Sequence, residues 1–243
     1  MSLQRAISAI YPPQCITCKA LVASDFGLCP ACWRDTPFIT GLVCDKCGCP
    51  LPGEPELQGE AAAICDDCLR AARPWSQGRA AMLYDGNARR MILALKHGDR
   101  MELARPAGKW LRQAAEPMLV PGMVVVPVPL HWWRMVRRKC NQSALLAAAL
   151  AKAAQLEHCP DALIRSRNTG SQEGRGREDR FHNVRGAFQL HPRRGKRING
   201  RPVLLVDDVM TSGATLAAAA EALLAGGAAE VSVLSLARVA KEA

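Results

Sequence analysis

The chain has 243 residues, of which 49% are hydrophobic and 22% are charged, and its formal net charge is +10. This composition is sufficient for a hydrophobic core and excludes a wholly disordered chain. No apolar run reaches the roughly 18–20 residues that a membrane-spanning helix needs, and the amino terminus lacks the features of a secretory signal, so we expect a cytoplasmic protein without a membrane span.

Nine of the 11 cysteines lie before residue 69, and eight of these form four C-x-x-C pairs. The pairs are spaced as C-x2-C-x10-C-x2-C and then as C-x2-C-x17-C-x2-C. Because two intervening residues let one turn aim both sulfurs at a tetrahedral ion, this spacing predicts two closed, structural Zn²⁺ sites. The expected ligands are Cys15, Cys18, Cys29, Cys32, Cys44, Cys47, Cys65 and Cys68.

A disulfide framework and a redox-active C-x-x-C motif are the alternatives for these cysteines. Cytosolic thiols stay reduced, and four pairs within 54 residues do not resemble one thioredoxin-like active site. We therefore expect two sequential zinc ribbons, at residues 15–32 and 44–68, although the spacing also fits a cross-braced pairing. Cys49 is predicted to be a free thiol, with competition for the second metal as its alternative.

The composition changes after Cys68, and this change divides the chain. We expect a double zinc ribbon domain at residues 1–70, a linker at 71–79 and a second domain at 80–243. In the second domain the pattern predicts strands at residues 80–84, 123–128, 203–206 and 231–237, and helices at residues 87–96, 103–115, 141–155 and 214–224. This alternation predicts an α/β fold with a mainly parallel sheet and flanking helices, whose ligands bind beyond the carboxyl ends of the strands.

One predicted strand end carries a dense set of polar residues. Residues 203–206 are apolar, two acids follow, and a small, hydroxyl-rich turn then opens a helix. Backbone N–H groups of such a turn can surround a phosphate, and the acids suit sugar hydroxyls or hydrated Mg²⁺. The alternative is ordinary helix capping by these residue types. The candidate binding residues are Asp207, Asp208, Val209, Met210, Thr211, Ser212, Gly213, Ala214 and Thr215.

This segment closely resembles the phosphoribosyl-pyrophosphate (PRPP) signature of type I phosphoribosyltransferases. The resemblance implies that Asp207 and Asp208 hold the ribose hydroxyls, that residues 210–215 cradle the 5′-phosphate, and that Mg²⁺ accompanies PRPP. Purine-salvage members have an Asp in the loop where this chain has Thr211, which weakens any expectation of purine-base proton transfer. We assign no catalytic residue.

The positive charge is concentrated in one segment, since residues 134–201 hold 16 basic and 5 acidic residues. Its first part suits a pyrophosphate or anion loop, with the candidates His131, Arg134, Arg137, Arg138, Asn141 and Gln142. A later part is polar and lacks apolar periodicity, which predicts a flexible loop that closes over a polyanion. The candidates in that loop are Arg165, Arg167, Thr169, Gln172, Arg180 and Asn183. For any single arginine, a solvated surface position is the alternative.

The order of these motifs is similar to that of the ComF family over nearly the whole chain. The resemblance rests on the early cysteines, residues 95–99, 127–129 and 141–143, the arginine-rich loop and the PRPP signature. It implies a PRPP-binding protein that handles single-stranded DNA during natural competence, with DNA-uptake proteins as partners. The alternatives are an active phosphoribosyltransferase of unknown acceptor and a catalytically silent zinc-ribbon interaction module.

Aromatic residues bear on the DNA hypothesis, because their rings can stack on unpaired bases. Trp33, Phe38 and Trp75 flank the ribbons, and Trp132 and Trp133 lie at the basic segment. For each tryptophan, both base stacking and burial in the core stay open.

Overall fold

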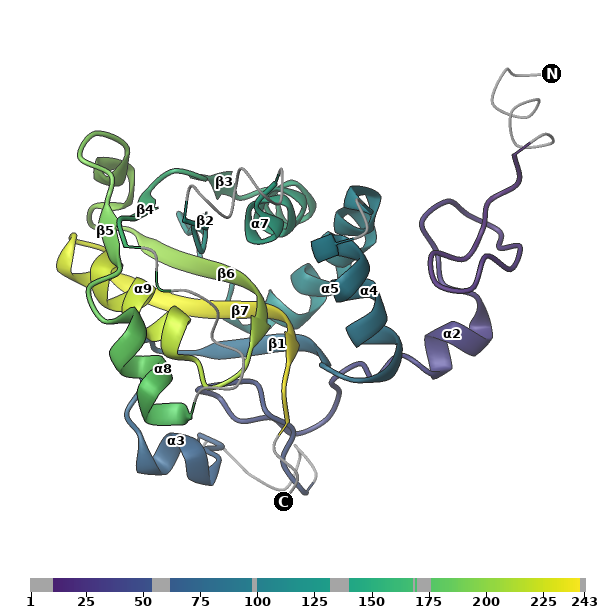
Figure 1. Cartoon of the computed structure of the whole chain (residues 1–243), viewed down its shortest axis with the longest axis horizontal. Helices are drawn as coiled ribbons and strands as arrows, with labels where there is room; N and C mark the ends of the chain where they lie inside the picture. Colours follow the sequence, from purple (N-terminus) through teal and green to yellow (C-terminus); the bar gives the residue numbers. More distant parts are fainter. Residues whose placement is uncertain are drawn as a thin grey trace.

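The computed structural model describes residues 11–53, 62–97, 100–131, 140–167, 169 and 176–240. Across these residues, five parallel strands form one sheet in the order β1-β7-β6-β2-β3 (Figure 1). The strands are β1 (Gly78–Leu83), β2 (Val124–Pro127), β3 (Glu157–His158), β6 (Pro202–Met210) and β7 (Glu230–Arg238). Strands β6 and β7 are the longest of these and lie at the centre of the sheet, so they position whatever is built at its carboxyl edge.

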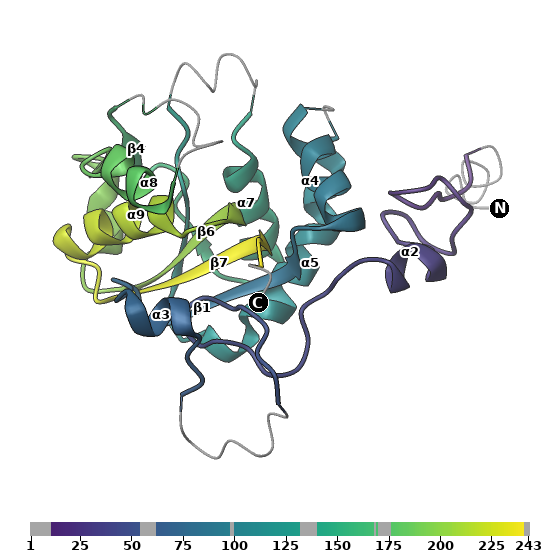
Figure 2. The same cartoon turned by 60° about the horizontal axis from the view of Figure 1, so that its bottom comes forward.

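Helices cover both faces of this sheet (Figures 1 and 2). Alternate residues of β6 point to opposite faces, so that Leu204 and Val206 join one apolar cluster while Val203 and Leu205 join another. The first face packs against α4 (Gly86–His97), α5 (Ala104–Ala115) and α7 (Gln142–Ala154). The second face packs against α9 (Ala214–Ala225), with α8 (Arg177–Val184) beside it. The absence of polar residues from the first half of β6 follows from burial on both faces.

Shorter elements complete the described fold. Strands β4 (Leu163–Arg165) and β5 (Phe188–Leu190) pair antiparallel as a separate ribbon next to α9. Two short helices lie in the cysteine-rich part, α2 (Pro30–Arg34) and α3 (Asp66–Arg70). Single 3₁₀ turns occur at η2 (Met101–Leu103), η3 (Glu116–Met118) and η4 (Arg194–Ile198).

The structure confirms the α/β class, the mainly parallel sheet and the flanking helices. Two local predictions were wrong. Strand β6 continues to Met210 because β7 pairs with it as far as Arg238, so the two acids lie inside the strand and not after it. The stretch predicted as one flexible loop begins at the end of β4 and reaches the start of β5, and its described part contains α8, because Phe181 and Val184 pack this helix against the core despite its polar composition.

The two cysteine-rich parts lie in different places. The first, with α2, extends away from the sheet next to α4 and α5 (Figure 1). The second lies against β1, and the approach is so close that a Cβ on Gly78 would be 2.5 Å from the Lys46 carbonyl oxygen. Trp75, in the segment expected to be a linker, is buried with 1% of its surface exposed. Among the residues described, no helix is long and apolar enough to cross a membrane.

Candidate functional site

A cleft of about 320 Å³ opens at the carboxyl ends of the central strands. It is lined by the whole predicted signature, residues 207–215, together with side chains from α4, α7, β4 and α8. Among the other predicted site residues, Gln142, Arg165 and Arg180 reach this cleft. Segments that are more than 60 positions apart in sequence thus converge where a parallel sheet binds its ligands.

The two acids at the cleft are held by specific partners. Ser143 donates its hydroxyl to Asp207 Oδ1 over 2.9 Å, and the Asp208 N–H donates to the same oxygen over 2.9 Å. Asp208 forms an ion pair with Lys96, with 3.1 Å between Oδ2 and Nζ. Burial and the adjacent Asp208 carboxylate raise the pKa of Asp207 to about 7, although the Ser143 hydroxyl opposes the shift. The pair therefore carries less than two full negative charges near neutral pH.

The turn after β6 has the geometry of an anion cradle. Gly213 adopts a left-handed backbone conformation with φ of +80° and is the amino-terminal cap of α9. Ser212 accepts a hydrogen bond from the Ala214 N–H through its hydroxyl over 3.4 Å, which closes the turn. Helix α9 is 12 residues long, and the first N–H groups of a helix lack partners within it and point along its axis. The turn and helix start thus present donors and a positive dipole end to the cleft.

The described part of the predicted anion loop lies only partly at the cleft. Gln142 lines it, whereas Asn141 caps α7, accepting from the Ser143 N–H over 3.1 Å and donating to the Val128 carbonyl oxygen over 3.1 Å. His131 is buried. The predicted residues Arg134, Arg137 and Arg138 lie outside the described residues.

The predicted flexible-loop residues divide into two groups. Arg165, on β4, and Arg180, on α8, line the cleft. Arg167 donates to the Asn183 carbonyl oxygen over 2.9 Å, and Asn183 donates from its side chain to the Thr169 carbonyl oxygen over 2.7 Å. This second group ties the segment to α8 and does not line the cleft. Gln172 lies outside the described residues.

Sequence reasoning missed three polar residues that line the cleft, namely Tyr84, Lys96 and Ser143. Lys96 and Ser143 lie in motifs used for the family resemblance, but nothing in their spacing indicates that they contact Asp208 and Asp207. Lys96 lies at the carboxyl end of α4, 112 positions before its partner in the sequence. A basic residue at a helix end, facing a strand that carries two acids, is the signal that could have pointed to it.

The eight predicted zinc ligands form two separate clusters. Cys15, Cys18, Cys29 and Cys32 have their sulfurs within 4.8 Å of one another, and so do Cys44, Cys47, Cys65 and Cys68. This grouping is sequential and not cross-braced, and the second cluster closes without Cys49. The Cys18–Cys29 and Cys47–Cys65 sulfurs are 3.6 Å apart. Sulfurs around a tetrahedral Zn²⁺, with bonds of about 2.3 Å, are about 3.8 Å apart, so both clusters suit zinc ribbon sites.

Backbone N–H groups support the thiolates that a metal requires. The N–H groups of Cys29 and Cys65 donate to the sulfurs of Cys15 and Cys44, each over 3.3 Å. At Cys15, burial is outweighed by backbone donors from Cys18 and Cys29, and the pKa falls to about 6. Burial raises the pKa of Cys32 in the same cluster. Metal binding therefore displaces the remaining protons, and Zn²⁺ affinity should rise with pH.

The comparisons with known proteins agree with these two parts. Residues 6–69 match the double zinc ribbon domain family, and residues 141–243 match the phosphoribosyl transferase domain family. The fold and the cysteine clusters thus define a double zinc ribbon protein with a phosphoribosyltransferase domain.

Full-length relatives specify the family further. The DNA utilization protein YhgH of Escherichia coli is 31% identical over 234 residues, which cover 93% of this chain and 97% of the relative. Competence protein F of Haemophilus influenzae is 29% identical over 231 residues, covering 93% and 96% of the two chains. Competence protein ComFC of Bacillus subtilis is 28% identical over 236 residues, covering 93% and 90%. The chain belongs to the family of these competence and DNA-utilization proteins, the ComF family.

Proposed function

We propose that the cleft at the end of β6 binds PRPP or a closely related phosphorylated ribose. The observation that carries this proposal is the convergence in one cleft of an acid pair, a hydroxyl-rich turn at a helix start, and two arginines from other elements. Asp207 and Asp208 would accept hydrogen bonds from ribose hydroxyls, and the turn at Ser212–Gly213 would hold the 5′-phosphate. Arg165 and Arg180 would face the pyrophosphate.

Mg²⁺ fits this arrangement as a companion of the ligand. Carboxylate oxygens of the acid pair are ligands of the hard type that Mg²⁺ takes, and a site of this kind usually leaves several positions to water and substrate phosphates. A bound Mg²⁺ would offset the charge of the pyrophosphate. The Lys96 ammonium, already 3.1 Å from Asp208, adds a fixed positive charge beside the same carboxylate.

Calorimetric titration of Mg²⁺-PRPP into the zinc-loaded full chain tests this proposal. We expect saturable binding that Asp208→Asn greatly weakens, because that change removes a charged acceptor from the cleft. Arg197→Gln, outside the cleft, is the matched control and should bind as the unmodified chain does. Absence of saturable heat, or equal affinity in Asp208→Asn, would refute the proposal. Release of pyrophosphate on adding a nucleobase would instead establish a transferase.

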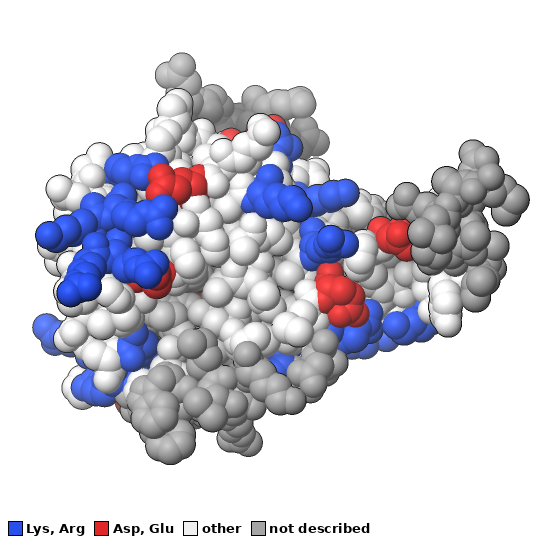
Figure 3. Space-filling model, turned by 90° about the horizontal axis from the view of Figure 1, so that it is seen from above, with Lys and Arg blue, Asp and Glu red and all other residues white. Residues whose placement is uncertain are grey.

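We also propose that the protein handles single-stranded DNA. The names of the relatives support a DNA-related role, and the charge distribution supports contact with a polyanion longer than PRPP. Figure 3 shows a dense group of Lys and Arg side chains at the left of the molecule, with a few acidic ones among them. Five basic residues fall within nine positions before β6, namely Arg193, Arg194, Lys196, Arg197 and Arg201.

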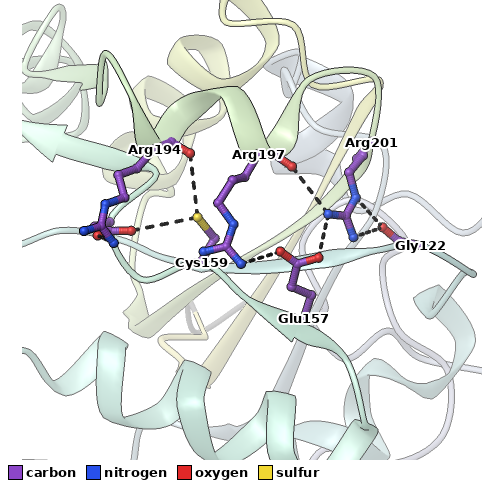
Figure 4. Close-up of polar contacts among 7 residues, drawn as sticks. Gly122, Glu157, Cys159, Arg194, Arg197 and Arg201 are labelled. Atoms are coloured by element: carbon purple, nitrogen blue, oxygen red, sulfur yellow. Dashed lines mark hydrogen bonds and ion pairs between the residues drawn. The ribbon is translucent and has the colours of Figure 1, made fainter.

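This basic group lies at the edge of the sheet opposite the cleft. It precedes β6 and adjoins β3, whose Glu157 pairs with the first residue of β2, so it is at the amino ends of parallel strands. Arg197 and Arg201 donate to the two oxygens of Glu157 over 2.5 and 2.7 Å, and Arg201 also donates to the Gly122 carbonyl oxygen (Figure 4). Arg194 pairs with Asp161 over 2.8 Å. Two carboxylates thus fix three guanidinium groups while leaving an excess of positive charge for phosphates.

The available aromatic residues bear on how bases could be held. Trp75 is buried and is excluded from base stacking, whereas Trp33 is 53% exposed and contacts Phe38, with ring centroids 4.6 Å apart. Trp132 and Trp133 lie outside the described residues. Phosphate contacts would therefore supply most of the affinity, with little dependence on sequence.

Salt dependence of single-stranded DNA binding tests this second proposal. A fluorescent oligonucleotide should bind the full chain at low salt and dissociate as salt rises, because counterions released from phosphates drive the association. The double change Arg194→Gln with Arg197→Gln should lower the salt slope by about one per lost phosphate contact, while Arg34→Gln on the first ribbon leaves it unchanged. Undetectable binding at low salt, or an affinity that does not change with salt concentration, would contradict the proposal.

A further inference from the structure

The segment that leaves the second zinc ribbon runs directly behind the phosphate-binding turn. Arg73 donates from Nη1 to the Ser212 carbonyl oxygen over 2.9 Å. A Cβ added to Gly213 would be 3.1 Å from the same nitrogen and 3.2 Å from the Trp75 ring. Neither Arg73 nor Trp75 lines the cleft, so both support the turn from its outer side.

These supporting side chains are also linked to the second ribbon. Trp75 donates its indole N–H to the Lys46 carbonyl oxygen over 2.5 Å, between the ligands Cys44 and Cys47. The Arg73 guanidinium lies 5.5 Å from the centre of the Trp75 ring, so the two supporting side chains also contact each other. A chain of direct contacts therefore joins the second cysteine cluster to the turn after β6.

The hydrogen bond from Arg73 to the Ser212 carbonyl oxygen orients the next backbone N–H of the turn. In a trans peptide the C=O and the following N–H point in opposite directions, so a Ser212 carbonyl held by Arg73 directs the Gly213 N–H away from Arg73. Gly213 lines the cleft, and its left-handed φ of +80° is a conformation that other residues adopt at a penalty. Arg73 thus fixes the orientation of one donor in the cradle and limits the freedom of the turn.

We propose that Arg73 is a positioning residue for the phosphate-binding turn, and that through it the second zinc ribbon forms part of the ligand site. This inference rests on the proposed PRPP-binding function. The second ribbon then has a role beyond stabilising its own loops, because its folded state sets the geometry of a cleft whose ligand it does not touch. The first ribbon lacks such a contact within the described residues, and its cluster packs with Val22 and Leu28.

The test compares Mg²⁺-PRPP affinity, zinc content and thermal unfolding in the full chain and three variants. In Arg73→Ala we expect affinity to fall about tenfold, the loss of one hydrogen bond made by a charged donor, while two zinc ions per chain are retained. Arg73→Lys should restore part of the affinity, because an ammonium on a long side chain can reach the Ser212 carbonyl. Arg70→Ala, an exposed arginine at the end of α3, is the matched control and should bind normally.

The outcomes separate this inference from the proposed function. If the unmodified chain does not bind Mg²⁺-PRPP, the proposed function fails. If it binds and Arg73→Ala binds equally well, the positioning role is wrong. A loss of zinc in Arg73→Ala would also overturn that role, because the turn would then be disturbed through the metal site. Weaker binding with full zinc content and partial rescue by Arg73→Lys would support it.

Discussion

The two cysteine clusters have the same ligand chemistry but different surroundings. The buried cysteines of the first lie in a small cluster of their own with Val22 and Leu28, and that ribbon meets the rest of the chain through Ile16, which is buried among residues of the sheet and α4. The second belongs to the same apolar cluster as Val233 on β7, Val126 on β2 and the residues of α9. The same C-x-x-C pairs thus produce one cysteine cluster that lies outside the domain core and one that is part of it.

The difference teaches that the ligands of a zinc ribbon and the role of that ribbon are separate properties. Ligands depend on local turns, which the C-x-x-C spacing specifies. The role depends on what the ribbon packs against. Gly78 allows the second ribbon to approach β1, and Arg79 pairs with Asp45 over 2.7 Å. Such contacts join residues 34 positions apart and are not visible in the spacing.

Removal of a single cysteine ligand from each cluster should give the largest difference in stability between the two ribbons. Cys44→Ser removes a buried ligand from the cluster in the domain core, and we expect the whole chain to unfold at a much lower temperature. Cys15→Ser should loosen residues 15–32 and leave the main unfolding transition near its original temperature. Each variant should contain one zinc ion per chain. Calorimetry with metal analysis measures both effects, and equal losses of stability would abolish the contrast.

Two tryptophans, one beside each ribbon, extend the comparison to residues that do not bind the metal. Trp75→Ala should lower the free energy of unfolding by about 3–5 kcal/mol, because it removes a fully buried ring. Trp33→Ala should lower it by about 1 kcal/mol or less, because the exposed ring loses one aromatic contact. Denaturant unfolding of both variants checks this order. A larger effect at Trp33 would mean that the first ribbon is as integral as the second.

Two left-handed glycines separate backbone strain from contact with the second ribbon. Gly41 has φ of +76° with nothing within 4 Å of an added Cβ, whereas at Gly213 the added Cβ would meet Arg73 and Trp75. Both Ala substitutions should cost about 1–2 kcal/mol of stability from the backbone alone. Only Gly213→Ala should also weaken Mg²⁺-PRPP binding. Parallel loss of affinity in Gly41→Ala would argue against the described support of the turn.

A smaller effect on thermal stability is expected from Asp207, in the cleft whose turn the second ribbon supports. Folding raises the pKa of Asp207 from 3.8 to about 7 through burial and Asp208, so its ionisation destabilises the folded chain. The stability that the folded chain has with a protonated Asp207 is fully present below about pH 4 and is lost as the pH rises through about 7. Asp207→Asn should therefore unfold at a higher temperature than the unmodified chain near pH 8 and at a similar one near pH 4. A pH-independent difference would contradict this.

Much of the fold was predictable because its signals are local. The apolar run before Asp207, the glycines that follow the helix at residues 214–224, and the alternation of strands and helices each depend on near neighbours. Strand β6 extends beyond its apolar run because β7 supplies hydrogen-bond partners as far as Arg238. Helix α8 forms in a polar segment because two of its side chains meet the core. Both corrections come from tertiary contacts that override local pattern.

The residues of the candidate site also divide into those that local sequence predicts and those that tertiary contacts bring together. The residues at 207–215 come together because they are adjacent in sequence, and the structure places all of them at the cleft. Lys96 and Ser143 reach the cleft from α4 and α7, and Arg73 reaches the outer side of the turn, but no spacing rule joins these residues to their partners. Arg165 and Arg180 were selected for their charge, which alone does not distinguish them from Arg167. Tertiary structure makes that distinction.

Hydrogen–deuterium exchange with and without Mg²⁺-PRPP tests the central claim most directly, since it reports on the cleft and both ribbons in one experiment. If the second ribbon supports the ligand site, the ligand should slow exchange at residues 207–216 and also at residues 68–76, while residues 15–32 exchange as before. Protection confined to the cleft, or protection of the first ribbon equal to that of the second, would contradict the claim.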